Sequence, residues 1–182
     1  MQITTTEIQR YFERYSAHLQ YVVVAHTPYS CYSANERQIA ELSQQAQAGC
    51  RHALNCFAKS LYKGSTNKSV RKPQLYRPLS LTTMEGARQT ANRHLTIHFN
   101  IFLGNIPTQY IAGDIEALFR HAWRDKAGMS DDVKLYAITE QNCRQWIGYT
   151  LKETGISRTN ITGTYTTWDV ANSYIPHQAL VD

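Results

Sequence analysis

A tyrosine and a lysine lie three residues apart in the stretch IGYTLKETG, residues 147 to 155, near the end of a predicted helix. Residues at positions i and i+3 share one helix face, so the phenol of Tyr149 and the ammonium of Lys152 should be neighbours. A phenolate is a nucleophile, and a nearby cation can stabilise its charge. A packed aromatic ring and a solvated amine have the same spacing, so the pair indicates chemistry only if other elements supply matching groups.

The predicted strand RHLTIHFNIFLG, residues 93 to 104, carries a second set of candidate groups. Side chains alternate between the two faces of a strand, so one face of this strand is apolar and the other is polar. The apolar face holds Leu95, Ile97, Phe99, Ile101 and Leu103, and the polar row holds His94, Thr96, His98 and Asn100. His98 and Asn100 lie about 6 to 7 Å apart along the strand and can converge on one ion, whereas His94 is about 13 Å from His98. A solvent-facing polar row is the alternative interpretation.

Hydrophobic periodicity and turn residues predict the elements that must position these groups. In chain order we predict a helix over 5–18, a strand over 19–29, a helix over 34–63, a polar basic loop over 64–73, strands over 75–85 and 93–104, a helix over 112–128, a strand over 133–139 and a helix over 140–153. From the first strand, this order indicates an α+β fold with a ferredoxin-like β-α-β-β-α-β antiparallel sheet and the tyrosine on a C-terminal helix. We expect one domain over residues 1–182, with a core of about 21–155 and a C-terminal arm over 156–182.

The composition fits a soluble globular domain, because 42% of the 182 residues are hydrophobic and 18% are charged. The net charge of +5 favours a polyanionic partner such as nucleic acid. The four cysteines form no CxxC pair, so we interpret them as reduced thiols of a cytosolic protein. We expect no secretion signal and no membrane span, since the first residues lack an apolar segment and no run of 18 apolar residues occurs.

The strand and helix motifs together resemble those of the HUH endonucleases, the rolling-circle replication initiators. The hallmark of that family is His-hydrophobe-His on a central strand, followed by a helix with Tyr-x-x-Lys. This chain has HFN at residues 98–100 and YTLK at residues 149–152, in the same order, and the resemblance covers about residues 21–155. It implies a one-tyrosine enzyme, because Gln145 and Glu153 stand four residues before and after Tyr149.

The resemblance also implies a reaction and a metal ion. Tyr149 would attack a phosphate of single-stranded DNA and form a covalent 5′-phosphotyrosine intermediate, and Lys152 would stabilise the phenolate or the phosphate. The implied cofactor is Mg²⁺ or Mn²⁺, with His98, Asn100 and Glu85 as ligands, because relatives draw a carboxylate from the preceding strand. Asn100 departs from the second histidine of the family, although some viral initiators similarly have glutamine there. Glu85 also fits a surface acid beside a turn.

The implied partners are single-stranded DNA, at a replication origin or a hairpin, and a host helicase or polymerase. Candidates for backbone contacts are Arg77, Arg88, Arg93, Lys68, Arg71 and Lys72, and candidates for base stacking are Tyr76 and Tyr110. Any of these residues also fits an ordinary surface. The implied location is the cytoplasm for a bacterial plasmid, phage or mobile element, and the host nucleus for a virus.

Two alternatives remain open. A single-tyrosine transposase of the same superfamily would use Glu153 as a metal ligand. A non-catalytic module that binds single-stranded nucleic acid is the other alternative. Such modules display aromatic residues on the open sheet face, where this chain places His98 and Asn100.

Overall fold

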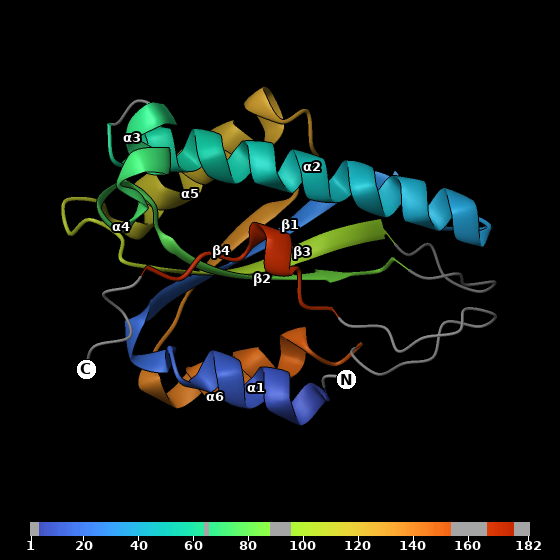
Figure 1. The fold of residues 1–182 in the computed structure, drawn as a ribbon, viewed down its shortest axis with the longest axis horizontal. Coiled ribbons are helices and arrows are strands. Elements are labelled where there is room, and N and C mark those ends of the chain that lie inside the picture. The colour runs from blue at the N-terminus through green and yellow to red at the C-terminus, as the bar shows by residue number, and fades with distance from the viewer. Residues whose placement is uncertain (1–3, 64–65, 88–95, 154–166, 177–182) are drawn as a thin grey trace.

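One antiparallel sheet organises the protein, whose computed structural model describes residues 4–63, 66–87, 96–153 and 167–176. The strand order is β2-β3-β1-β4, with β1 at Leu19–Ser30, β2 at Leu79–Glu85, β3 at Thr96–Gly104 and β4 at Val133–Ala137. Figure 1 shows α2 (Glu36–Leu61) and α5 (Ala112–Arg120) over one face, and α1 (Thr5–Glu13) and α6 (Glu140–Thr150) over the other. The predicted α+β architecture, an antiparallel sheet with packed helices, is therefore confirmed.

Each face of the sheet has its own apolar core, because successive side chains of a strand point to opposite faces. On the side of α2 and α5, Phe99 and Phe119 both pack against Trp123, with ring centroids 5.8 Å apart in each pair. On the side of α1 and α6, Phe12 packs edge to face on Phe102. The predicted apolar face of β3 is confirmed from Ile97 to Leu103, and Leu95 and His94 lie outside the described residues.

Side-chain caps fix the starts of the helices that carry and support the candidate site. Thr4 caps α1, Asn35 caps α2 and Thr139 caps α6, and each makes a capping box with the residue three positions later. Helix α6 ends at Thr150, so Lys152 lies in the turn directly after it. Among the residues that the structure describes, no helix is both long and apolar enough to cross a membrane.

The predictions for residues 64–85 are wrong in two details. The segment expected to be a polar loop contains two short helices, α3 (Thr66–Arg71) and α4 (Pro73–Tyr76). Lysine and arginine have good helix propensity, and proline is favoured at the first position of a helix, where Pro73 stands. As α4 uses residues up to Tyr76, the next strand begins at Leu79 rather than at Leu75.

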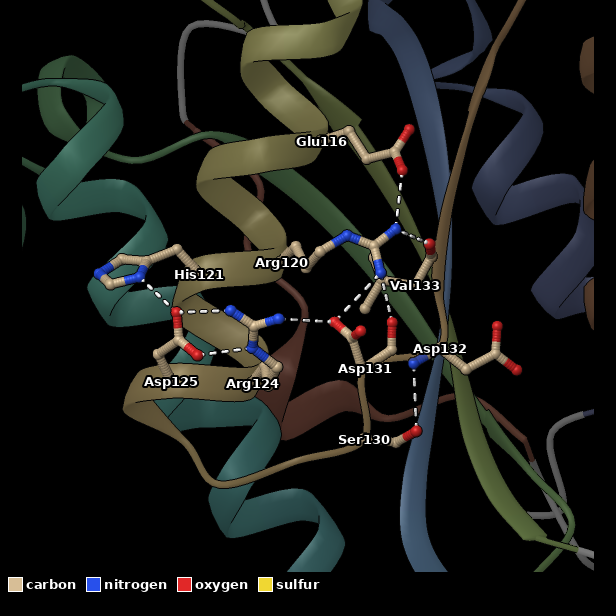
Figure 2. A network of polar contacts seen from close by, with 9 residues as sticks. All are labelled: Glu116, Arg120, His121, Arg124, Asp125, Ser130, Asp131, Asp132 and Val133. Atoms are coloured by element: carbon tan, nitrogen blue, oxygen red, sulfur yellow. Dashed lines mark hydrogen bonds and ion pairs between the residues drawn. The ribbon is translucent and has the colours of Figure 1, made fainter.

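A network of charged side chains joins the end of α5 to the segment before β4 (Figure 2). Helix α5 continues into a π-helix, η2, over His121–Lys126. Arg120 pairs with Glu116 at 2.8 Å and with Asp131 at 3.3 Å. Arg124 bridges Asp125 and Asp131 at 2.6 and 3.2 Å. These contacts fix how the chain passes from η2 back into the sheet at β4.

Candidate functional site

Three polar side chains form a row across three adjacent strands, on the face that α6 covers. Strand pairing places Glu85 of β2 directly opposite His98 of β3, and His98 directly opposite His26 of β1. Directly paired residues project to the same face of a sheet, with Cβ atoms about 4.5 to 5.5 Å apart. The antiparallel pairing of β2 with β3 therefore brings Glu85 beside His98.

Glu85 is the centre of this row, with a fully buried side chain. Its Oε2 atom lies 2.9 Å from Nε2 of His98 and accepts a hydrogen bond from Lys152 Nζ at 2.8 Å. Burial raises the pKa of Glu85, but the hydrogen bonds from His98 and Lys152 and their charges lower it more, so its net pKa is below the usual value. Glu85 is thus a buried carboxylate held ionised by two neighbours.

Lys152 links this carboxylate to the candidate nucleophile. Its Nζ atom lies 3.6 Å from the ring centroid of Tyr149, so the predicted proximity of the two side chains is confirmed. Partial burial lowers the pKa of Lys152, but the contacts with Glu85 and then Tyr149 outweigh it and give a raised pKa. Tyr149 itself is 52% exposed, so its ring faces solvent and not the core. A substrate can therefore reach it.

Asn100 lies two residues further along β3, on the same face as His98. Its side chain is fully buried, yet no described residue forms a hydrogen bond with either its amide oxygen or its amide nitrogen. The second carboxylate oxygen of Glu85, Oε1, also lacks a partner among the described residues. Buried polar atoms without partners are rare in proteins and destabilise the fold, so these three atoms call for an explanation.

These unpartnered atoms suit a cation. A carboxylate oxygen and an amide oxygen are donors that Mg²⁺ or Mn²⁺ accepts. The imidazole of His98 would join them through Nε2 in place of its contact with Glu85, since its Nδ1 lies 3.2 Å from the carbonyl oxygen of Thr96. Within the described part of the chain, no group of three or more histidine, cysteine, aspartate or glutamate side chains is placed to hold a metal ion. The donor set therefore depends on the amide of Asn100 as its third member, as the sequence motif implies.

His26 is a residue of this site that the sequence analysis missed. Its ring stacks on that of His98, with centroids 5.0 Å apart, and its Nδ1 lies 3.1 Å from Asp132 Oδ2. Burial and then the charge of His98 lower the pKa of His26, although Asp132 acts in the opposite direction. A signal was present, because His26 continues the alternation of Val22 and Val24 towards α6. The run of valines in this strand is typical of a strand buried on both faces, which hid that signal.

Glu153, the alternative ligand, is buried at the same end of β2. Its Oε2 atom accepts a hydrogen bond from the backbone N–H of Gly86 at 2.9 Å. Gly86 has a φ of +79°, and a Cβ there would meet the carbonyl oxygen of Thr96 at 2.4 Å. Only glycine fits this position, so Glu153 fixes the backbone beside Glu85 at a point where the chain cannot vary.

Those predicted DNA-binding residues that the structure describes do not gather around Tyr149. Lys68, Arg71 and Lys72 are exposed in or beside α3 and α4, which Figure 1 places in the layer of α2, across the sheet from α6. Arg77 donates to Asn55 Oδ1 at 3.1 Å and lies 5.2 Å from the ring of Tyr174. Arg88 and Arg93 lie outside the described residues. Contacts of these six residues with DNA stay a prediction.

The geometry thus connects the C-terminal helix to the polar row through Tyr149, Lys152, Glu85 and His98. Each step is a direct contact between neighbouring side chains. Tyr149 and Lys152 are exposed, and Glu85 is buried. Comparison of the chain with protein-family models, with curated proteins and with solved structures gives no match.

Proposed function

We propose that this protein is a metal-dependent endonuclease that nicks and rejoins single-stranded DNA through a covalent bond to Tyr149. The observation that carries the proposal is the position of Lys152, whose Nζ lies 2.8 Å from Glu85 Oε2 and 3.6 Å from the ring centroid of Tyr149. One cation thereby joins an exposed phenol to a buried carboxylate and histidine. A surface tyrosine and lysine without a catalytic role would not require a fully buried carboxylate beside them.

The fold supports the same assignment. The strands lie in the order β4-β1-β3-β2 and pair antiparallel throughout, which is the arrangement expected of a ferredoxin-like sheet. The helices α2 and α5 cover one face, as the two helices of that fold do. The added helices α1 and α6 cover the other face, and Tyr149 of α6 is linked to His98 through Lys152 and Glu85. This position suits a catalytic helix.

Tyr149 is the nucleophile of the proposed reaction. Its oxygen forms a bond to phosphorus while the bond from phosphorus to the 3′ oxygen breaks, which leaves a 5′-phosphotyrosine and a free 3′-hydroxyl. The phenol loses its proton and the departing 3′ oxygen gains one. Lys152 stabilises the negative charge on the phenolate and then on the phosphate, and Glu85 keeps the ammonium in place. Attack by the 3′-hydroxyl on the phosphotyrosine reverses the reaction and rejoins the strand.

Glu85, His98 and Asn100 are the residues that would hold Mg²⁺ or Mn²⁺. The bound ion supplies a Lewis acid that polarises a non-bridging oxygen of the phosphate. The fit rests on the unpartnered Oε1 of Glu85 and amide oxygen of Asn100. Oε2 of Glu85 is already engaged with Lys152 and His98, so the two oxygens of one carboxylate have different tasks. Asn100, buried in the sheet, has no other evident partner among the described residues.

Covalent capture of DNA tests this function. The protein is incubated with Mn²⁺ and end-labelled single strands, both random-sequence and hairpin-forming, and adducts are resolved on denaturing gels. We expect an adduct that is lost in Tyr149→Phe and in the presence of chelator. The matched control is Tyr32→Phe, because Tyr32 has a similar exposure, 47%, and takes no part in the contacts that join Tyr149 to Glu85. An adduct that persists in Tyr149→Phe would exclude this nucleophile, and the absence of any adduct with the whole pool would exclude the reaction.

A further inference from the structure

A pocket of about 380 Å³ lies beside Tyr149, between α6 and the half of the sheet formed by β1 and β4. Its lining includes His26, Lys134, Tyr136, Gln145, Trp146 and Tyr149. Apart from Tyr149, none of these residues has a part in the proposed reaction. Pockets of this size commonly hold small organic groups with a few polar contacts.

Three aromatic side chains lie next to one another along this pocket. The rings of Tyr136 and Trp146 lie 5.0 Å apart between centroids, and Trp146 meets Tyr149 edge to face at 5.9 Å. Tyr136 is 40% exposed and Tyr149 52% exposed, so two large aromatic side chains border the same hollow without being covered. Flat aromatic faces next to solvent are good platforms for stacking planar ligands, including all four DNA bases.

Two polar side chains complete the pocket. Lys134 is exposed and stands two residues before Tyr136 on β4, so both project to the same face, opposite Val24 and Val22 of β1. Gln145 is exposed on α6, one residue before Trp146. An ammonium binds phosphate, and a glutamine amide offers both a donor and an acceptor to the edge of a base. An apolar peptide side chain would use neither group.

We propose that this pocket binds one unpaired base of a DNA strand, at a nucleotide next to the phosphate that Tyr149 attacks. The base stacks on the exposed ring of Tyr136 beside Trp146, Gln145 contacts its edge, and Lys134 contacts the adjoining phosphate. The inference rests on the proposed function for its assignment of the strand as the substrate of Tyr149. Base binding itself requires no cleavage and is measured separately.

The binding test uses the four deoxynucleoside 5′-monophosphates as probes, with 2′-deoxyribose 5-phosphate as the probe without a base. The indole N–H resonance of Trp146 is followed by nuclear magnetic resonance and is assigned with Trp146→Phe. The indole of Trp168, which donates to Ser173 Oγ at 3.1 Å, serves as an internal reference outside the pocket. We expect the nucleotides to shift the Trp146 signal and leave that of Trp168 in place. The sugar phosphate should have no effect on Trp146.

Variants of exposed residues sharpen the test. Tyr136→Leu should weaken nucleotide binding about fivefold or more, the lower end of what base stacking on one aromatic ring contributes. Gln145→Ala should reduce the differences in affinity among the four nucleotides. The fold should stay intact, because Gln145 is a surface residue of α6. Tyr32→Leu is the matched control, since Tyr32 is 47% exposed and does not line the pocket. A Trp146 signal that no nucleotide shifts, or that the sugar phosphate shifts equally, overturns the proposal.

Adduct formation separates this inference from the proposed function. If nucleotides bind at Trp146 but no single strand gives an adduct, the nuclease function fails and base binding stands. If adducts form, abasic sites are placed in turn at each position near the cleaved phosphate of the reactive strand. The pocket is supported if an abasic site at one position slows adduct formation by the native protein but not by Tyr136→Leu. Equal rates at every position overturn the pocket and leave the nuclease function in place.

Discussion

Arg120 and Glu85 each lie at the centre of a cluster of charged groups, but the two clusters differ in depth. Around Arg120 the side chains are open to solvent, with Asp131 63% exposed and Glu116 38% exposed, and both of these carboxylates pair with Arg120 (Figure 2). Glu85 is fully buried, and one of its oxygens has no partner among the described residues. The amide of Asn100 nearby is equally without described partners.

This difference separates a structural network from a candidate site. Exposed ion pairs each contribute little to stability, and their side chains stay hydrated. The Arg120 cluster therefore holds η2 against the segment before β4 without burying a charge. A buried carboxylate loses its hydration, and unpartnered amide atoms add to that loss. Stability alone gives no reason to keep Glu85 and Asn100 inside the sheet. We therefore attribute their presence to function, which the following variants test.

Glu85→Gln should have the largest effect, because it keeps the shape of the side chain but removes the charge that holds Lys152 and His98. We expect adduct formation to slow by roughly 100-fold or more, the size of effect seen when one electrostatic contact of an active site is removed. The free energy of unfolding should fall by about 1 to 3 kcal/mol, as for lost hydrogen bonds to charged groups. Gel assays and urea denaturation measure the two quantities.

Glu116→Gln is the matched control in the exposed network, where it removes the 2.8 Å contact with Arg120. It should lower the free energy of unfolding by less than about 1 kcal/mol and leave adduct formation unchanged. Equal loss of stability in both variants would remove the distinction between the clusters. Normal adduct formation by Glu85→Gln would remove Glu85 from the mechanism.

Asn100→Leu should change the free energy of unfolding less than Glu85→Gln does, and it should raise it. Leucine has a similar volume and no polar atoms, so it removes two buried groups that lack described partners. We expect the metal-free protein to become more stable by about 1 kcal/mol, while Mn²⁺-dependent adduct formation falls. Thermal unfolding in chelator and gel assays give both values. A loss of stability would mean that the amide is satisfied in the folded protein, and its role as a ligand would lose its support.

The sequence was sufficient to predict contacts between residues that are close together in the chain or on consecutive strands. Alternation along β3 predicted which side chains face α6. Helical spacing predicted that Tyr149 and Lys152 are neighbours, and they are, although Lys152 lies in the turn after α6 and not in the helix. The pairing of β2 with the next strand of the chain, β3, accounts for the approach of Glu85 to His98. In each case the contact is local in the chain or follows from one hairpin.

Contacts between distant strands were beyond the sequence analysis. His26 meets His98 only because β1 pairs with β3, and Tyr136 meets Trp146 only because α6 folds back over β4. The spacing of residues along the chain predicts neither of these two contacts. The helices α3 and α4 were missed for another reason, since their asparagine, serine and proline residues are typical of turns.

The smallest expected effect is that of salt on the protonation of one carboxylate from each cluster, Asp125 and Glu85. Asp125 pairs with Arg124 and His121 in solvent, which lowers its pKa from 3.8 to about 2, and Glu85 also has a lowered pKa because of His98 and Lys152, despite its burial. For both groups the pKa in the folded protein lies below the pKa in the unfolded chain. Both therefore stabilise the fold at a pH above the unfolded pKa, and they lose that effect as the pH falls through the folded pKa.

At pH 3.8, Asp125 should therefore remain ionised in low salt. At about 1 M NaCl the screening length falls to about 3 Å, so Asp125 should take up protons at that pH, whereas Glu85 at pH 4.5 should not. Carbon-13 spectra of the two carboxyl groups in chelator measure both fractions, and an equal response to salt would show that Glu85 is as open to solvent as the network around Arg120.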